Sequence, residues 1–256
     1  MEGPSLVLTC EEFSVFFKER VIEASGSARI PFDKITGSYL KNARSWGKHL
    51  ILEFADVTLR IHFLMFGSYR LDDPRDGREP KLLLEYGDHK VYFYSCAIKE
   101  LPKGWEKTYD WSIDLMAPEW DAPQALANLR AKAKEQVSDL LMDQQIFSGL
   151  GNIMKNEILY NLRMHPETKF AELSPAKQRA LVRESESYAW QFYEWKKENV
   201  LMKNWKIMRK KICPRCEGPV CKKKTGKLQR WSHFCPHCQP RETTAGRRVD
   251  VQAAHV

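Results

Sequence analysis

Four cysteines near the C-terminus carry the clearest spacing signal in the sequence. Cys213 and Cys216 form one Cys-x-x-Cys pair, Cys235 and Cys238 form a second, and eighteen residues separate the two pairs. Each pair places two thiolates on one tight turn, so two pairs supply the four sulfur ligands of a tetrahedral Zn²⁺ ion. Four thiolates leave no open coordination position, which predicts one structural zinc ion. The alternative, a redox dithiol, would need one such pair beside a βαβ pattern, which the sequence lacks.

Positive charge is concentrated in the segment that leads into these cysteines. The whole chain has a formal net charge of +8. Residues 196–230 contain thirteen Lys and Arg against two acidic residues, a net charge of +11, so the rest of the chain carries −3. A cationic segment on a nearly neutral body is typical of proteins that bind a polyphosphate. A solvated surface would give the same composition.

The composition excludes several classes of protein. The chain has 256 residues, of which 43% are hydrophobic and 29% charged, as in a soluble globular protein and unlike a collagen-like or wholly disordered one. No segment approaches the ~18 apolar residues of a membrane helix. Glu11 and Glu12 lie where a signal peptide would be apolar, so we expect an intracellular protein. The seven cysteines are an odd number, which argues against a disulfide framework.

The predicted secondary structure changes from strands to helices about halfway along the chain. Four segments of the first half predict strands, because apolar and β-branched residues fill them and turn residues separate them: 49–54, 57–66, 81–86 and 90–96. Residues 72–80 predict a loop, and residues 11–22 predict an amphipathic helix with three phenylalanines on one face. Four segments of the second half predict helices: 122–134, 136–147, 152–162 and one that opens at Ser174-Pro175.

A glycine turn separates two of these helices. Gly149-Leu150-Gly151 permits a tight change of direction, and Asn152 follows as a predicted N-cap. The exposed N–H groups in the first turn of the following helix suit an anion. Taken alone, most such segments are turns and nothing more.

Five segments together resemble one family. Residues 141–157, which contain this turn, resemble the helix–two-turns–helix motif of the formamidopyrimidine-DNA glycosylase and endonuclease VIII family. Four others resemble the same family in the same order: Met1-Glu2-Gly3-Pro4, Gly47-Lys48-His49-Leu50, 60–67 and 230–239. Within the family, these motifs are most similar to those of the third vertebrate endonuclease VIII-like branch and its bacterial relatives. The resemblance extends over nearly the whole chain.

The resemblance implies an α+β fold and a domain order. It implies an N-terminal β-sandwich with a flanking helix, a helical domain with the helix–two-turns–helix motif, and a C-terminal four-cysteine zinc finger. We place these domains at 1–118, 119–205 and 206–240, with a flexible tail at 241–256. The family flips a damaged nucleotide out of the duplex to act on its base. The implied partner is therefore damaged DNA, bound by a monomer in the cytoplasm or nucleoid.

The resemblance also implies roles for single residues. The N-terminal amine, here that of Met1, would attack C1′ of the sugar, and Glu2 would protonate the ring oxygen. Lys48 would hold a phosphate and assist β-elimination. Asn152 and Arg230 would bind the phosphates that flank the lesion, Arg230 also within the catalytic set. Met65 would fill the gap left by the flipped base.

The chain departs from the family pattern at four places. Glu follows Met directly, where the family usually exposes Pro or Val after removal of Met. Leu64 replaces a strand glycine, and Ser138 stands where some members have a phosphate-binding Lys. Residues 94–99 lack the Arg and Phe that fill the opposite-strand gap in members that repair oxidised guanine. These departures favour lesions in single-stranded, open or cross-linked DNA over oxidised guanine in a plain duplex.

We therefore predict a DNA glycosylase of base-excision repair that removes oxidised bases and has associated lyase activity. Three alternatives stay open at this point. One is a monofunctional glycosylase that acts on single-stranded or cross-linked DNA, and another is a non-catalytic protein that binds damaged DNA. The third, an RNA-binding zinc-ribbon protein, leaves Met1, Glu2 and Lys48 unexplained.

Overall fold

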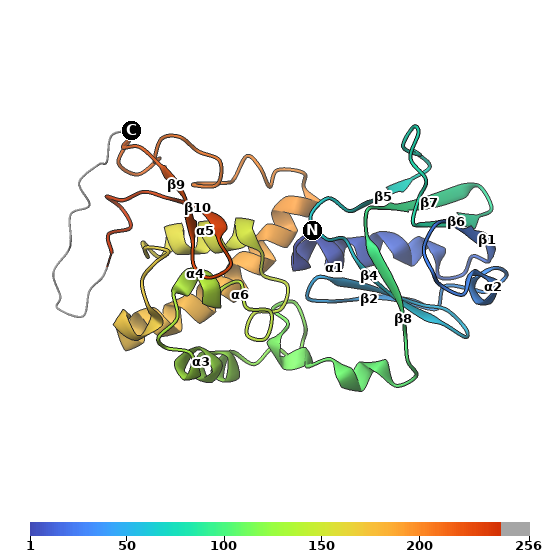
Figure 1. Cartoon of the computed structure of the whole chain (residues 1–256), viewed down its shortest axis with the longest axis horizontal. Helices are drawn as coiled ribbons and strands as arrows, with labels where there is room; N and C mark the ends of the chain where they lie inside the picture. Colours follow the sequence, from blue (N-terminus) through green and yellow to red (C-terminus); the bar gives the residue numbers. More distant parts are fainter. Residues whose placement is uncertain (242–256) are drawn as a thin grey trace. The chain divides into compact units, whose positions relative to one another are not determined.

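The computed structural model describes residues 1–241, which divide into two compact units (Figure 1). The first unit is Met1–Asp110, and the second begins at Trp111. The tail predicted at 241–256 lies, from residue 242 onward, outside the described residues. None of the helices within 1–241 combines the length and apolar character needed to cross a membrane.

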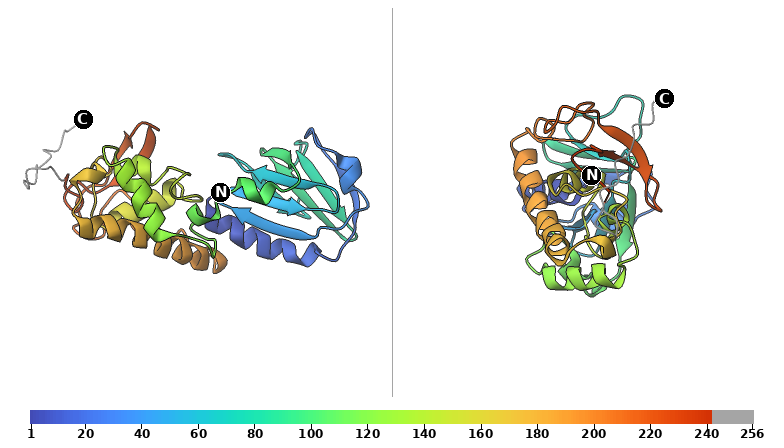
Figure 2. Two further views of the ribbon diagram at one scale, coloured as in Figure 1. Left: turned by 90° about the horizontal axis from the view of Figure 1, so that it is seen from below. Right: turned by 90° about the vertical axis from the view of Figure 1, so that its left-hand side faces the viewer.

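Two four-stranded antiparallel sheets form the first unit (Figures 1 and 2). One sheet has the order β1-β6-β7-β5 and the other the order β2-β3-β4-β8. The strands are β1 (Val21–Ser25), β2 (Asn42–Trp46), β3 (His49–Glu53), β4 (Thr58–His62), β5 (Ser68–Leu71), β6 (Leu82–Tyr86), β7 (His89–Tyr94) and β8 (Ala97–Leu101). Alternate side chains of both sheets form one buried apolar core, as expected for a sandwich.

The first helix of the first unit begins earlier than the sequence predicts. The expected helix at 11–22 is wrong, because α1 spans Gly3–Phe13 and packs against β2 and β3. Pro4 lies in its first turn, where a missing N–H costs nothing. The chain then makes one 3₁₀ turn, η1 (Ser14–Phe16), because Phe16 turns inward to stack on Tyr86 with ring centroids 4.6 Å apart. The short helix α2 (Phe32–Ile35) follows β1.

The strand β4 is shorter than predicted. The sequence predicts a strand to residue 66, but β4 ends at His62 and Leu64 adopts a left-handed φ of 51°. Gly67 N–H donates to the Phe63 carbonyl at 2.7 Å, and a Cβ at Gly67 would lie 2.1 Å from that oxygen. This tight turn projects residues 64–66, here called the apolar tip, out of the sheet. The hairpin predicted at Gly87-Asp88 is confirmed between β6 and β7.

The second unit is helical up to the cysteine-rich segment. Its helices are η3 (Trp111–Ile113), α3 (Ala122–Ala131), α4 (Val137–Leu140), α5 (Asn152–Asn161), η4 (Phe170–Glu172) and α6 (Pro175–Lys197), and η2 (Trp105–Thr108) precedes them in the first unit. The start of α6 is confirmed, since the Ser174 hydroxyl accepts the Lys177 N–H. Asn152 is not the N-cap of α5: Gly151 takes that position, and Asn152 is the first helical residue.

The helix predicted at 136–147 is also wrong beyond its first turn. The Asp143 carboxylate accepts the Gln145 N–H at 2.9 Å, which favours a turn over a continuing helix. The Gln144 amide donates to the carbonyls of Met142 and Leu150 and accepts the Gly149 N–H. These local bonds close the chain into two turns before α5. A two-stranded ribbon of β9 (Cys221–Thr225) and β10 (Arg230–Phe234) follows α6 and packs on α5 (Figure 1).

Candidate functional site

The start of the chain is partly withdrawn from solvent. Gly3 and Pro4 are buried, and Met1 keeps 38% of its surface exposed. Burial lowers the pKa of the Met1 amine below its ordinary 8.0, Glu2 raises it, and Lys48 lowers it again. Burial is the largest of these effects because a charged ammonium loses solvation there. The neutral, nucleophilic form of this amine is therefore more populated near neutral pH than that of an exposed terminus.

Lys48 reaches this region from the hairpin between β2 and β3. Gly47, with a φ of 52°, and Lys48 form the turn, and Trp46 pairs with His49 at its base. The pKa of His62, at the end of β4, is lowered by burial, then by Lys48 and by the amino terminus. The positive charges of the amine and of Lys48 therefore both disfavour protonation of His62. The structure brings together Met1, Glu2, Lys48 and His62, called here the N-terminal site.

Aromatic side chains flank the N-terminal site. The His49 and His62 rings lie 5.6 Å apart, and Trp46 and Tyr109 pack on His49 at 5.6 and 5.8 Å. Burial, followed by the charges of Arg60 and His62, lowers the pKa of His49 to about 4. His49 is neutral at physiological pH, so these aromatic side chains add surface to the N-terminal site without adding charge.

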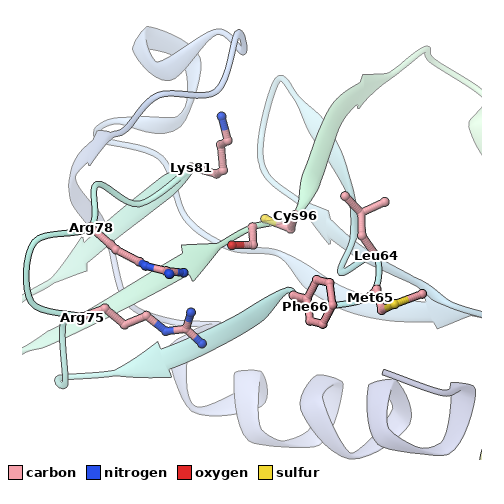
Figure 3. A pocket seen from close by; sticks show the side chains of 8 residues that line it. Leu64, Met65, Phe66, Arg75, Arg78, Lys81 and Cys96 are labelled. Carbon is pink, nitrogen blue, oxygen red and sulfur yellow. The ribbon is translucent and has the colours of Figure 1, made fainter.

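Met65 lies on the apolar tip, beside a hollow in the same unit (Figure 3). Met65 is 65% exposed and Phe66 is 79% exposed, which is unusual for large apolar side chains. Arg75, Arg78 and Lys81 contribute three positive charges to the lining of the hollow. Arg75 donates to the Ser68 hydroxyl at 2.8 Å and lies 5.2 Å from the centre of the Tyr94 ring. The structure thus places Met65 on a solvent-exposed projection next to cations.

The four predicted cysteine ligands converge. The sulfur atoms of Cys213, Cys216, Cys235 and Cys238 all lie within 4.8 Å of one another. Cys213 and Cys238 are 3.8 Å apart and Cys216 and Cys235 are 3.5 Å apart, close to the ~3.8 Å edge of a tetrahedron with bonds of ~2.3 Å. This arrangement could hold one metal ion. Although burial opposes ionisation of Cys213, hydrogen bonds from Tyr160 and from backbone N–H groups lower its pKa, whereas burial raises the pKa of Cys235 and of Cys238.

Polar side chains of α5 hold the ribbon in place. The Asn152, Lys155 and Asn156 side chains all donate to the Trp231 carbonyl, at 3.1, 3.3 and 3.4 Å. Lys155, which is fully buried, also donates to the Ser232 hydroxyl at 2.8 Å, and Asn156 accepts the His233 N–H. Asn152, which the resemblance assigns to phosphate binding, therefore also anchors β10. An amide NH₂ has two donors, so this bond leaves one N–H of Asn152 for another acceptor.

Arg230 follows a turn whose backbone is held by hydrogen bonds to Asp139. The Asp139 carboxylate accepts the N–H groups of Lys227 and Leu228 at 2.9 and 3.4 Å. Gly226 has a φ of 69°, and a Cβ there would lie 2.1 Å from an Asp139 oxygen. Only glycine lets the turn approach this carboxylate. Arg230, the first residue of β10, follows this turn and pairs with Thr225 of β9.

Sequence reasoning missed the residues that position this part of the second unit. They are buried and polar: Asp139, Lys155, Asn156 and Glu157. Glu157 is fully buried, and its carboxylate accepts three backbone N–H groups, those of Lys206, Ile207 and Met208, at 2.7–2.9 Å. Three polar residues in succession on a helix that also carries Met154 and Ile158 were the available signal. The pattern by itself did not show what they would bind.

Comparisons with known proteins agree with this geometry. A family model described as "Formamidopyrimidine-DNA glycosylase H2TH domain" matches residues 116–189, which include α3 through most of α6. Residues 116–189 therefore match the helix–two-turns–helix domain of formamidopyrimidine-DNA glycosylases, and the chain is similar to endonuclease VIII proteins. The resemblance predicted from the sequence is confirmed.

Individual relatives show how far the likeness extends. "Endonuclease 8-like 3" of Mus musculus is 29% identical over 213 residues, which cover 79% of this chain and 35% of the relative. The chain therefore spans about a third of the length of that relative. "Endonuclease 8" of Salmonella newport is 27% identical over 227 residues, covering 80% of this chain and 85% of the relative.

A solved structure shows the same fold. A Lactococcus lactis formamidopyrimidine-DNA glycosylase in complex with abasic-site DNA has a TM-score of 0.81 at 21% identity, covering 93% of this chain and 99% of the other. The predicted α+β class, with N-terminal sheets, helices and a C-terminal cysteine cluster, is confirmed.

Proposed function

We propose that this chain is a DNA glycosylase of base-excision repair that removes oxidised bases and then cleaves the strand as a lyase. The observation that carries the proposal is the partly buried N-terminal amine, whose pKa lies below 8.0, beside Glu2 and Lys48. A neutral amine is the nucleophile that such a reaction needs. The names of the relatives, and the abasic-site DNA in the related complex, support the same assignment.

The chemistry follows from the groups of the N-terminal site. The Met1 nitrogen would attack C1′ of the damaged nucleotide, the bond between C1′ and the base would break, and the leaving base would take up a proton from water. The Glu2 carboxylate would accept a proton from the attached nitrogen and pass it to the ring oxygen, which opens the sugar and leaves a protonated imine at C1′. Loss of the C2′ proton to water would then expel the 3′ phosphate, which Lys48 would hold.

Other residues would bind the DNA. Arg230 would hold a phosphate with its planar guanidinium, and Asn152 would donate its remaining N–H to a second phosphate. Met65, exposed on the apolar tip, would occupy the space of the flipped base. The cations of the second unit would add affinity that falls with salt, because phosphate neutralisation releases counterions.

We further propose that the metal is a single structural Zn²⁺ held by Cys213, Cys216, Cys235 and Cys238. The four-sulfur donor set and the sulfur separations fit a closed tetrahedral site. The ion would fix the two cysteine turns and so support the ribbon that carries Arg230. It would have no part in the reaction, since no ligand position is open.

Borohydride trapping tests the proposed function. The full chain is incubated with oligonucleotides that contain an abasic site, an oxidised pyrimidine or a hydantoin, then reduced with borohydride, and the adduct is mapped by peptide mass spectrometry. We expect an adduct on the Met1 amine, and none in a chain whose N-terminus is extended by two residues. Base release without an adduct would show a monofunctional glycosylase. Neither release nor adduct on any substrate would overturn the proposal.

A further inference from the structure

The ribbon carries an exposed tryptophan that none of the proposed roles uses. Trp231 is 45% exposed and follows Arg230 on β10. Successive residues of a strand point to opposite faces, so Trp231 points away from the face that carries Arg230 and the buried Ser232. We call Trp231 and its neighbours Lys222 and Lys224 the outer face of the ribbon.

Two lysines of the neighbouring strand lie against the Trp231 ring. The register pairs Trp231 with Lys224, and Lys222 is the diagonal neighbour on the same face. Their ammonium groups lie 5.6 Å and 4.7 Å from the ring centre. All three side chains are exposed. Lys223, between them, points to the other face and pairs with Glu167 at 2.8 Å. The outer face therefore combines one aromatic surface with two positive charges. Within residues 1–241, neither lysine forms an ion pair with an acidic side chain.

The backbone beneath Trp231 is unusually well fixed. Its carbonyl accepts three side-chain donors of α5, and the next residue, Ser232, bonds to both Lys155 and Thr225. A ring on such a backbone loses little further freedom when it binds a ligand, which favours binding. An exposed Trp on a fixed strand is thus placed as a rigid contact surface rather than as part of a core.

We propose that the outer face of the ribbon binds an unpaired nucleotide of single-stranded DNA, with the base stacked on Trp231 and its flanking phosphates on Lys222 and Lys224. Aromatic stacking needs a base that is not already stacked in a duplex, and lysines beside the ring supply the charge for the backbone. The inference rests on the proposed function only for the identity of the ligand as DNA. It names unpaired DNA next to the lesion as part of the substrate.

Binding measurements with matched variants test this proposal. The probes are a fluorescein-labelled oligo-dT, the same length of blunt duplex, and oligo-U, measured by anisotropy with the full chain. We expect Trp231→Ala to weaken oligo-dT binding about tenfold or more, Trp231→Phe to restore most of it, and duplex affinity to change less than twofold. The matched control is Trp190→Ala, because Trp190 on α6 is equally exposed, at 45%, and no cation contacts its ring within residues 1–241.

Three results would overturn the proposal. They are an equal loss for oligo-dT and duplex, an effect of Trp190→Ala as large as that of Trp231→Ala, and a loss confined to oligo-U. Metal content and circular dichroism show whether the alanine variant is folded, and Trp231→Phe and Lys222→Ala-Lys224→Ala supply independent tests if it is not. The anisotropy measures binding and does not depend on catalytic activity. Failure of the trapping experiment would therefore leave the strand preference measurable, and the reverse also holds.

Discussion

The two units place their functional groups by different physical means. In the first unit, withdrawal from solvent changes the pKa of one amine, with Glu2 and Lys48 adjusting it in opposite directions. In the second unit, buried polar side chains accept or donate several hydrogen bonds each and fix backbone segments, as Glu157 and Asp139 do. The amine proposed to react thus needs an environment that sets its pKa, whereas the ribbon proposed to bind DNA needs a rigid support. Substitutions of the buried polar residues in the second unit should therefore lower the stability of the fold. Substitutions near the amine in the first unit should mainly shift its pKa.

The largest effect is expected from removal of one of the four cysteines proposed to bind zinc. Cys235→Ser leaves three thiolates, and because metal binding contributes ~10 kcal/mol or more to the folding of small zinc domains, the ribbon should unfold. Bound zinc per chain, with hydrogen exchange over residues 206–240, measures the loss. Cys221→Ser is the control, since Cys221 lies outside the group of four. If the two variants retain equal zinc, the assignment of ligands is wrong.

A smaller loss is expected from the buried carboxylate of α5. Glu157→Gln replaces one acceptor oxygen by an NH₂ that faces backbone N–H groups, which should lower the free energy of unfolding by about 3 kcal/mol. Urea unfolding measures it. Glu135→Gln is the control, because the exposed Glu135–Lys227 pair should contribute less than ~1 kcal/mol. Similar losses for both variants would mean that the buried Glu157 carboxylate contributes no more to stability than an exposed ion pair.

Gly226, in the turn before Arg230, can be compared with Gly77, which lies in the loop between β5 and β6. Gly226→Ala meets Asp139 and a φ of 69°, whereas Gly77→Ala meets a similar φ of 63° and no atom within 4 Å. We expect a loss of about 2 kcal/mol for Gly226→Ala and about 1 kcal/mol for Gly77→Ala, the difference being the contact with Asp139. Thermal unfolding measures both. Weaker DNA binding should accompany only the former change, and its appearance in both variants would count against a positioning role for the turn.

The smallest energetic effect concerns the amine. Its pKa in the folded chain lies below 8.0, so the protonated form is disfavoured by folding and the associated stability is present above pH 8.0 and lost as pH falls through the folded pKa. Acylation of the amine followed by mass spectrometry at a series of pH values should give a midpoint below 8.0. Lys48→Met should raise this midpoint and Glu2→Gln should lower it, because their charges act in opposite directions.

Unfolded chain in urea is the control for this titration, and its midpoint should return to about 8.0. A folded midpoint that is unchanged by both substitutions would mean that neither residue faces the amine. In that case the N-terminal site would not be an electrostatic unit.

Local pattern predicted some elements and failed at others for identifiable reasons. The β6–β7 hairpin and the start of α6 follow from Gly87-Asp88 and Ser174-Pro175, whose preferences act over a few residues. The helix at 11–22 failed because Phe16 packs on Tyr86, seventy residues away. The predicted end of β4 failed because a turn at Gly67, closed by the Phe63 carbonyl, overrides the apolar composition of 57–66.

The sequence by itself determined the family resemblance, the four metal-ligand candidates and the groups that could react, because ligand type, spacing and motif order are properties of the chain. Only the tertiary structure decided that the amine, Lys48 and His62 influence one another, since the segments that carry them are far apart in sequence. It also decided that Asn152, Lys155 and Asn156 meet at one carbonyl of β10. A buried polar group must find its partner wherever the fold provides one, and that partner is not written in the neighbouring residues.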